Sequence, residues 1–233
     1  MENRMRIVKA AVVLGVFLLG IQIAFCADVS DSFDRPDSNA VGKTEAGNYK
    51  WVEIGDNMNG NLIAIREHSL QFHYFFELGT LKPTPNLACN LAELKAKNID
   101  LSVVIQCNPR YGGCYGVSYR LAEYTGKFDS PGYHVILNSK YTPYTISLKY
   151  GGVTVAKAIV VIPHTSKVRI VANGSSHKIY LNGNLEIDVT DSGETEDGYV
   201  KTDAGYVGLC SWYGIPIFRD FSLTLLKEEE IKK

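Results

Sequence analysis

The sequence has no excess of charge of either sign, because its 24 basic and 25 acidic side chains give a formal net charge of −1. These charges are mixed along the chain without a basic stripe, which argues against a nucleic-acid partner. The chain also lacks a G-x-S-x-G elbow, a phosphate-binding loop and a dinucleotide fingerprint, and no Ser-His-Asp arrangement is apparent. With no C-x-x-C pair and no histidine at ligand spacing, we expect no zinc or other transition-metal site.

The N-terminal segment is typical of a secretory signal peptide at residues 1–26. A basic start is followed by an apolar run, residues 10–25, that is short for a membrane span. Small residues, Ala24 and Cys26, favour cleavage after Cys26. We therefore expect a secreted, periplasmic or cell-envelope protein with no membrane span after cleavage. Lipid attachment at Cys26 is an alternative, although Phe25 fits that signal poorly, and an uncleaved anchor is another.

Residues 27–226 are long enough for one β-sandwich domain with a sizeable core, and residues 227–233 form a charged tail. Two dipeptides, one Asn-Gly and one Gly-Gly, mark hairpins. Asn182-Gly183 separates the apolar-alternating runs 179–181 and 185–189, and Gly151-Gly152 separates residues 145–150 from 153–161. Tight hairpin turns of this kind need positive φ at both central residues, which Asn and Gly adopt readily.

Other segments also favour strands. Residues 62–70 and 71–76 are expected to form two short strands around a turn, and residues 80–85 a loop. Leucines at helical spacing make residues 87–97 ambiguous, but we favour an extended conformation there. Residues 31–33 open the folded part, and further strands are expected at residues 101–107, 115–121, 133–137, 168–172, 206–210 and 215–221. Such a series of short strands predicts an all-β, antiparallel architecture.

Four cysteines follow the signal peptide: Cys89, Cys107, Cys114 and Cys210. An even number in a secreted chain predicts two disulfides, with three possible pairings. The turn-rich stretch between Cys107 and Cys114 would bring its ends together across a hairpin. We therefore favour Cys107–Cys114, which leaves Cys89–Cys210.

The ordered set of these segments resembles the concanavalin A-like lectin/glucanase superfamily, and within it the laminin G-like jelly-roll domains of secreted proteins. The matching pieces are residues 31–35 (DSFDR) with Gly42 and Trp51, 115–120 (YGVSYR), 179–183 (IYLNG), Asp191 with 205–209 (GYVGL), and 218–221 (FRDF). The resemblance implies a two-sheet antiparallel jelly-roll sandwich whose first and last strands pair at an edge. It leaves function open, because members include binding modules and polysaccharide hydrolases.

An enzymatic hypothesis rests on Glu186-Ile-Asp188-Val-Thr-Asp191, which resembles the E-I-D-x-x-E motif of laminarinase-type glycoside hydrolases. By that resemblance Glu186 is the nucleophile, Asp188 its helper and Asp191 the acid, with nucleophile and acid about 5–5.5 Å apart. In a regular strand Asp191 faces away from the other two, so a bulge would be needed. We therefore prefer an amphipathic strand.

The preferred function is binding, to a carbohydrate or another extracellular surface partner. Sugars stack on exposed aromatic rings flanked by polar groups. The candidate ligand-binding residues are Tyr111, Tyr115, Trp212 and Tyr213, with Tyr141 and Tyr144 around Pro143 as further candidates. A structural envelope protein is a third alternative.

A calcium ion is the one cofactor that the resemblance suggests, because laminin G-like domains often carry one at the sheet rim. The acids that could supply its oxygen ligands are Asp188, Asp191, Glu194, Glu196 and Asp197. They lack the D-x-D-x-D-G spacing of a calcium loop, so we favour a solubilising acidic loop without a cofactor.

Overall fold

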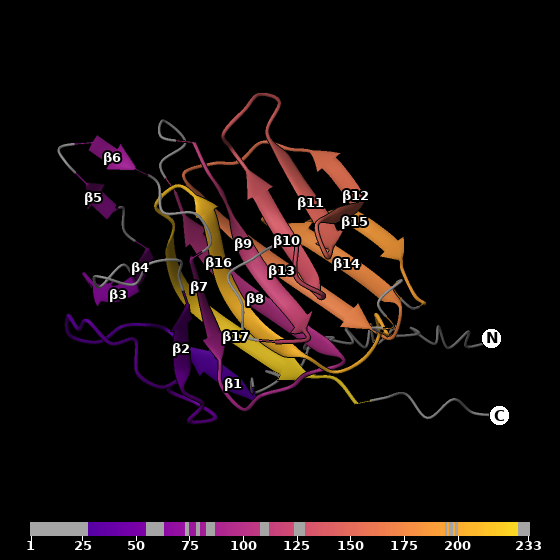
Figure 1. The fold of residues 1–233 in the computed structure, drawn as a ribbon, viewed down its shortest axis with the longest axis horizontal. Coiled ribbons are helices and arrows are strands. Elements are labelled where there is room, and N and C mark those ends of the chain that lie inside the picture. The colour runs from indigo at the N-terminus through magenta and orange to yellow at the C-terminus, as the bar shows by residue number, and fades with distance from the viewer. Residues whose placement is uncertain are drawn as a thin grey trace, which may run out of the picture.

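The protein is a sandwich of two antiparallel sheets, drawn as two layers in Figure 1. This computed structural model describes residues 28–54, 63–72, 75–77, 80–82, 87–107, 112–123, 129–193, 195, 198 and 200–227. Within these residues no helix has the length and apolar character needed to cross a membrane. The expectation of an all-β, two-sheet fold is confirmed.

The eight-stranded sheet has the order β15-β14-β13-β8-β17-β4-β3, with β1 pairing β17 beside this path. Its strands are β1 Val29–Asp31, β3 Ile63–Arg66, β4 Ser69–Phe72, β8 Ile99–Gln106, β13 Thr165–Asn173, β14 Ser176–Leu181, β15 Asn184–Thr190 and β17 Ile217–Leu225.

The seven-stranded sheet has the order β12-β11-β10-β9-β16-β7-β2. Its strands are β2 Trp51–Ile54, β7 Leu87–Leu91, β9 Cys114–Leu121, β10 Tyr133–Asn138, β11 Thr145–Tyr150, β12 Val153–Ile159 and β16 Tyr206–Tyr213. A separate hairpin of β5 Phe75–Glu77 and β6 Thr80–Lys82 lies beside the sandwich, at the left of Figure 1.

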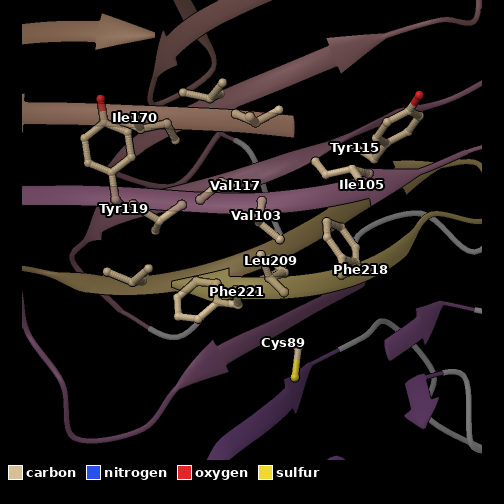
Figure 2. Packing of buried hydrophobic residues seen from close by; sticks show 14 of the residues in the cluster. Cys89, Val103, Ile105, Tyr115, Val117, Tyr119, Ile170, Leu209, Phe218 and Phe221 are labelled. Atoms are coloured by element: carbon tan, nitrogen blue, oxygen red, sulfur yellow. The ribbon is translucent and has the colours of Figure 1, made fainter. Parts of the chain in front are cut away.

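The core lies between the sheets because alternate side chains of each strand point inward. β8 shows this directly, since Ile99, Leu101, Val103 and Ile105 are buried and the residues between them are half-exposed. Figure 2 shows Val103 and Ile105 of β8 with Val117 of β9 and Leu209 of β16 in this layer. Burying one such aliphatic side chain contributes about 1.5–3 kcal/mol, so the two sheets stabilise each other.

Both hairpins expected from the Asn-Gly and Gly-Gly dipeptides are confirmed. Asn182 and Gly183 have φ of 52° and 88°, and they join β14 to β15. Gly151 and Gly152 have φ of 52° and 83°, and they join β11 to β12. For residues 87–97 the preference for an extended conformation is confirmed only over β7, Leu87–Leu91, which is buried along its whole length, because residues 92–97 belong to no strand.

Two local expectations are wrong. The turn expected near residue 70 lies at Glu67-His68, where both residues have positive φ and connect β3 to β4. Neither residue is a glycine or asparagine, so no composition signal marked the turn. The segment expected as a loop from residue 80 begins with strand β6.

The first and last strands pair, as the resemblance implied, with Val29 opposite Leu223 and Asp31 opposite Phe221. The Trp51 ring lies between Phe33 and Phe221, at centroid distances of 5.6 and 5.3 Å. Asp31 is fully buried, and its carboxylate accepts hydrogen bonds from three neighbouring groups. These are the Phe33 backbone N–H at 2.9 Å, the Arg35 guanidinium at 2.7 and 3.0 Å, and Trp51 Nε1 at 2.8 Å.

The four cysteines are free thiols, so both predicted disulfides are wrong. Cys89 lies opposite Leu209 in the β7–β16 register, while Cys210 lies opposite Ala88. Directly paired residues share a face of a sheet, so Cys89 and Cys210 point to opposite faces. Cys89 belongs to the core cluster that also holds Leu209 and Phe221, and Figure 2 labels all three.

The other pair, Cys107–Cys114, is wrong because the stretch between the two cysteines is not a hairpin. β8 belongs to the eight-stranded sheet and β9 to the seven-stranded sheet, so the connection crosses between layers. Cys107 joins the main core, whereas Cys114 packs against a small cluster on the far face of the other sheet. Burial raises the pKa of both thiols, which disfavours the reactive thiolate.

We expect Asp31→Asn to lower the free energy of unfolding by about 3–5 kcal/mol, because it removes the buried partner of Arg35. Urea denaturation monitored by tryptophan fluorescence measures this change. Asp188→Asn is the matched control, since the Asp188 side chain is 52% exposed and lies 3.6 Å from Lys178. Exposed pairs contribute at most about 1 kcal/mol, so equal shifts in the two variants would contradict the role given to Asp31.

Candidate functional site

The strand register places the outward side chains of the seven-stranded sheet in three rows, which we call the outer face. The first row runs from β16 to β12 and consists of Gly208, Ser118, His134, Lys149 and Thr154. The second row spans the same strands and consists of Cys210, Gly116, Ile136, Ser147 and Lys157. The third row begins at β9 and consists of Cys114, Asn138, Thr145 and Ile159. The alternate residues of the same strands, such as Val117 and Val135, belong to the core.

A small buried cluster occupies the β16 side of the outer face. Trp212 packs with Ala88, Ile136 and Cys210, apart from the main core. The His134 ring meets Trp212 edge to face at 5.7 Å, and His134 Nδ1 lies 2.8 Å from Ser118 Oγ. Trp212 is only 3% exposed, so the expectation that its ring offers a stacking platform is wrong, although the residue does lie on the outer face.

The other predicted ligand-binding tyrosines are placed differently. Tyr115 points into the core, with its hydroxyl 3.4 Å from Ser139 Oγ, so it is unavailable to a ligand and that prediction is wrong. Tyr111 lies outside the described residues. Tyr213 ends β16, and its backbone pairs with Cys114.

A cavity of about 490 Å³ lies at the β12 side of the outer face, beside the loop that joins β10 to β11. Six of the residues that line it are Asn138, Tyr141, Pro143, Thr145, Lys157 and Ile159. Tyr141 is 66% exposed, and Lys140 Nζ lies 5.2 Å from the centroid of its ring. The cavity thus combines an accessible aromatic ring with amide, hydroxyl and ammonium groups, a composition typical of small-ligand sites.

Of this lining, the sequence pointed to Tyr141 alone, as an aromatic residue beside Pro143. Asn138, Thr145 and Ile159 come from three successive strands and meet because they are directly paired across β10, β11 and β12. Lys157 is the next outward residue of β12, opposite Ser147. The hairpin of β11 and β12 was predicted from Gly151-Gly152, but the pairing of β10 with β11 and the face on which these residues lie were not.

The three acids of the laminarinase-like motif do not converge. β15 is the border strand of the eight-stranded sheet, on the opposite layer from the cavity. Its register shifts so that Ile187 lies opposite Ile179 and Leu185 opposite Tyr180, which leaves Glu186 as the extra residue of a bulge. Asp188 then points outward, where its carboxylate lies 3.6 Å from Lys178 Nζ.

Asp191 has different surroundings. Its carboxylate accepts hydrogen bonds from the Tyr133 hydroxyl at 3.1 Å and from Lys201 Nζ at 3.0 Å. Regular alternation from Asp188 to Asp191 puts the two on opposite faces, because the bulge precedes both. The motif therefore provides a bulged border strand and, at Asp191, an ion pair with Lys201. It does not assemble the three-carboxylate arrangement that the resemblance implied.

The calcium hypothesis involves the same strand end. Asp188 and Asp191 are each next to a lysine, as described above, and Glu194, Glu196 and Asp197 lie outside the described residues. Elsewhere in the described part of the chain, no three His, Cys, Asp or Glu side chains gather in a way that could hold a metal ion.

Two buried histidines are neutral at physiological pH. Burial lowers the pKa of His134 to about 4, although contacts with the Ser130 carbonyl and Asp129 favour its protonated form. Burial, and then the nearby Arg120 guanidinium, lower the pKa of His177 to about 4. His177 Nδ1 lies 2.7 Å from the Tyr119 hydroxyl, between the two sheets.

Solved structures with this architecture come from carbohydrate-related and uncharacterised proteins. A Bacillus subtilis protein of unknown function with a galectin-like fold superposes with a TM-score of 0.62 at 14% identity, covering 88% of this chain and 98% of the other. The carbohydrate-binding module CBM66 from Bacillus subtilis gives 0.51 at 16% identity, covering 75% and 94%. The Bacillus licheniformis β-glucanase gives 0.55 at 11% identity, covering 87% and 100%.

The chain therefore has the concanavalin A-like jelly-roll fold, as the sequence resemblance suggested. The likenesses do not single out laminin G-like domains within it. No protein-family model and no curated protein matches the chain. Identities at this level establish the fold alone.

We expect the free energy of unfolding to fall as the pH drops from 6.5 towards 4. Over this range an unfolded histidine binds a proton that His134 and His177 in the folded protein do not bind, so each destabilises the fold by about 1–2 kcal/mol at pH 5. Urea denaturation at several pH values measures the slope. His134→Gln should reduce the slope between pH 7 and pH 5, and an unchanged slope would contradict a neutral buried His134.

Proposed function

We propose that this protein is a secreted carbohydrate-binding module whose ligand lies on the outer face of the seven-stranded sheet. The observation that carries the proposal is the exposed Tyr141 ring at the edge of the 490 Å³ cavity. Sugar rings stack their C–H-rich faces on such aromatic rings, while neighbouring polar groups bind the hydroxyls.

The polar groups of the cavity lie where such a ligand needs them. Asn138 and Thr145 are directly paired, so an amide and a hydroxyl sit side by side on adjacent strands. Amide and hydroxyl groups both donate and accept hydrogen bonds, which matches the hydroxyls of a sugar. Because the strands carry these groups, little conformational entropy is lost when a ligand binds.

The likeness to the CBM66 module and to the β-glucanase supports a carbohydrate ligand, because both names refer to carbohydrate. The expected signal peptide agrees with this proposal, since it would deliver the domain to a compartment where polysaccharides are found. Binding is favoured over hydrolysis because Glu186, Asp188 and Asp191 have separate surroundings on the other sheet.

Binding to a panel of polysaccharides, followed by calorimetry on the best ligand, tests the proposal. Tyr141→Ala should weaken the affinity about 5- to 30-fold, because it removes an aromatic contact of about 1–2 kcal/mol. The control is Tyr180→Ala, since the Tyr180 ring lies on the outward side of the other sheet under Arg169. Absence of binding across the panel, or equal affinities of Tyr141→Ala and the parent, would refute it.

The hydrolase alternative has its own test. We expect the purified protein to release no reducing sugar from laminarin or lichenan, because the motif acids do not share a site. Wild-type activity that disappears in Glu186→Gln would instead show that these acids form a catalytic centre.

A further inference from the structure

The two exposed sheet surfaces carry different charge patterns. On the eight-stranded sheet, two outward cations pair with outward acids: Arg169 lies 2.6 Å from Asp100, and Lys178 lies 3.6 Å from Asp188. On the seven-stranded sheet the described strands contain one carboxylate, Glu53.

Glu53 does not contribute charge to the outer face, because it points the other way. It lies opposite Cys89, whose side chain is in the core, and its Oε1 accepts a hydrogen bond from the Val41 backbone N–H. The outward positions of these seven strands therefore include two lysines, Lys149 and Lys157, and no carboxylate.

At the cavity, positively charged lysine side chains are within reach of a ligand. Lys157 is an exposed lining residue, and Lys140 holds its ammonium group 5.2 Å from the centroid of the Tyr141 ring. None of the residues that line the cavity is acidic. Lys140 and Lys149 also lie near Cys114, because their charges oppose the rise that burial causes in the pKa of its thiol.

We propose that the glycan bound at this cavity is acidic, with a carboxylate or sulfate group against Lys157 and a sugar ring against Tyr141. This inference rests on the proposed function and narrows its ligand class. A neutral glycan would leave Lys157 without a counter-charge at the site, whereas an anionic sugar gains a charge-assisted hydrogen bond from it. The positive field also raises the local concentration of an anionic polymer.

Pairs of polysaccharides that differ in charge test the inference. Polygalacturonate is compared with its methyl-esterified form for the carboxylate, and dextran sulfate with dextran for the sulfate. We expect at least one anionic member to bind at least about tenfold more tightly than its neutral counterpart, with an affinity that falls as salt is added. The pair that shows the difference identifies the anionic group.

Lys157→Gln should weaken binding to the anionic member about 3- to 10-fold, consistent with the loss of one charge-assisted hydrogen bond. Lys178→Gln is the matched control, because the Lys178 side chain is 45% exposed and lies on the outward side of the opposite sheet. Thermal melts of both variants verify that they fold.

Three results would overturn the inference: equal affinity for charged and neutral members, an unchanged affinity in Lys157→Gln, or equally tight binding of a single-stranded oligonucleotide through Lys157. The first two results do not contradict the proposed function if the neutral polysaccharide binds and Tyr141→Ala weakens that binding. Absence of binding to every polysaccharide would remove the proposed function as well.

Discussion

The structure depends on one constraint, which is that every strand in a two-layer sandwich must turn alternate side chains towards the shared core. Because apolar burial supplies most of the stability, the register of each strand is strongly specified. The same register decides which residues remain for the outer face. Thus Val117 and Val135 are in the core, while their chain neighbours Ser118 and His134 lie together on the outside. The candidate site is a consequence of how the core is built.

Departures from this alternation explain why the positions of some residues were predicted wrongly from the sequence pattern. The bulge at Glu186 turns Leu185 outward, where it is 47% exposed, although Ile187 and Val189 face inward. The sheet that each strand joins also decides in which layer its side chains lie. β8 and β9 follow each other in sequence but enter different sheets, so Cys107 and Cys114 lie in different packing layers.

Much of the fold was predictable from the sequence, because alternation and turn chemistry are local. The hairpins at Gly151-Gly152 and Asn182-Gly183 and the strands around them are found. The pairing of the first and last strands is also found, but it was implied by the family resemblance and not by local pattern. The site was much less predictable. Whether an aromatic residue such as Tyr115 or Trp212 is buried or accessible depends on strand order and packing between layers, which are non-local. For the same reason Lys157 carried no signal as part of a lysine-bearing face.

The outer face has a closed side and an open side, and only the open side can bind a ligand. Its β16 side is closed by Trp212 and His134, and its β12 side is open at Tyr141 and Lys157. The opposite sheet, by contrast, carries two pairs of opposite charges, Arg169–Asp100 and Lys178–Asp188. A ligand that offers both a ring face and an anionic group is therefore complementary to the open side of this surface and not to the other sheet.

Backbone amide chemical shifts measured during titration with a galacturonate or sulfated oligosaccharide test this account most directly. We predict that the shifts concentrate in β10, β11 and β12 and in the loop around Tyr141, with β13, β14 and β15 unchanged. Shifts centred on β14 and β15, around Asp188 and Asp191, would contradict the account and place the ligand on the other sheet.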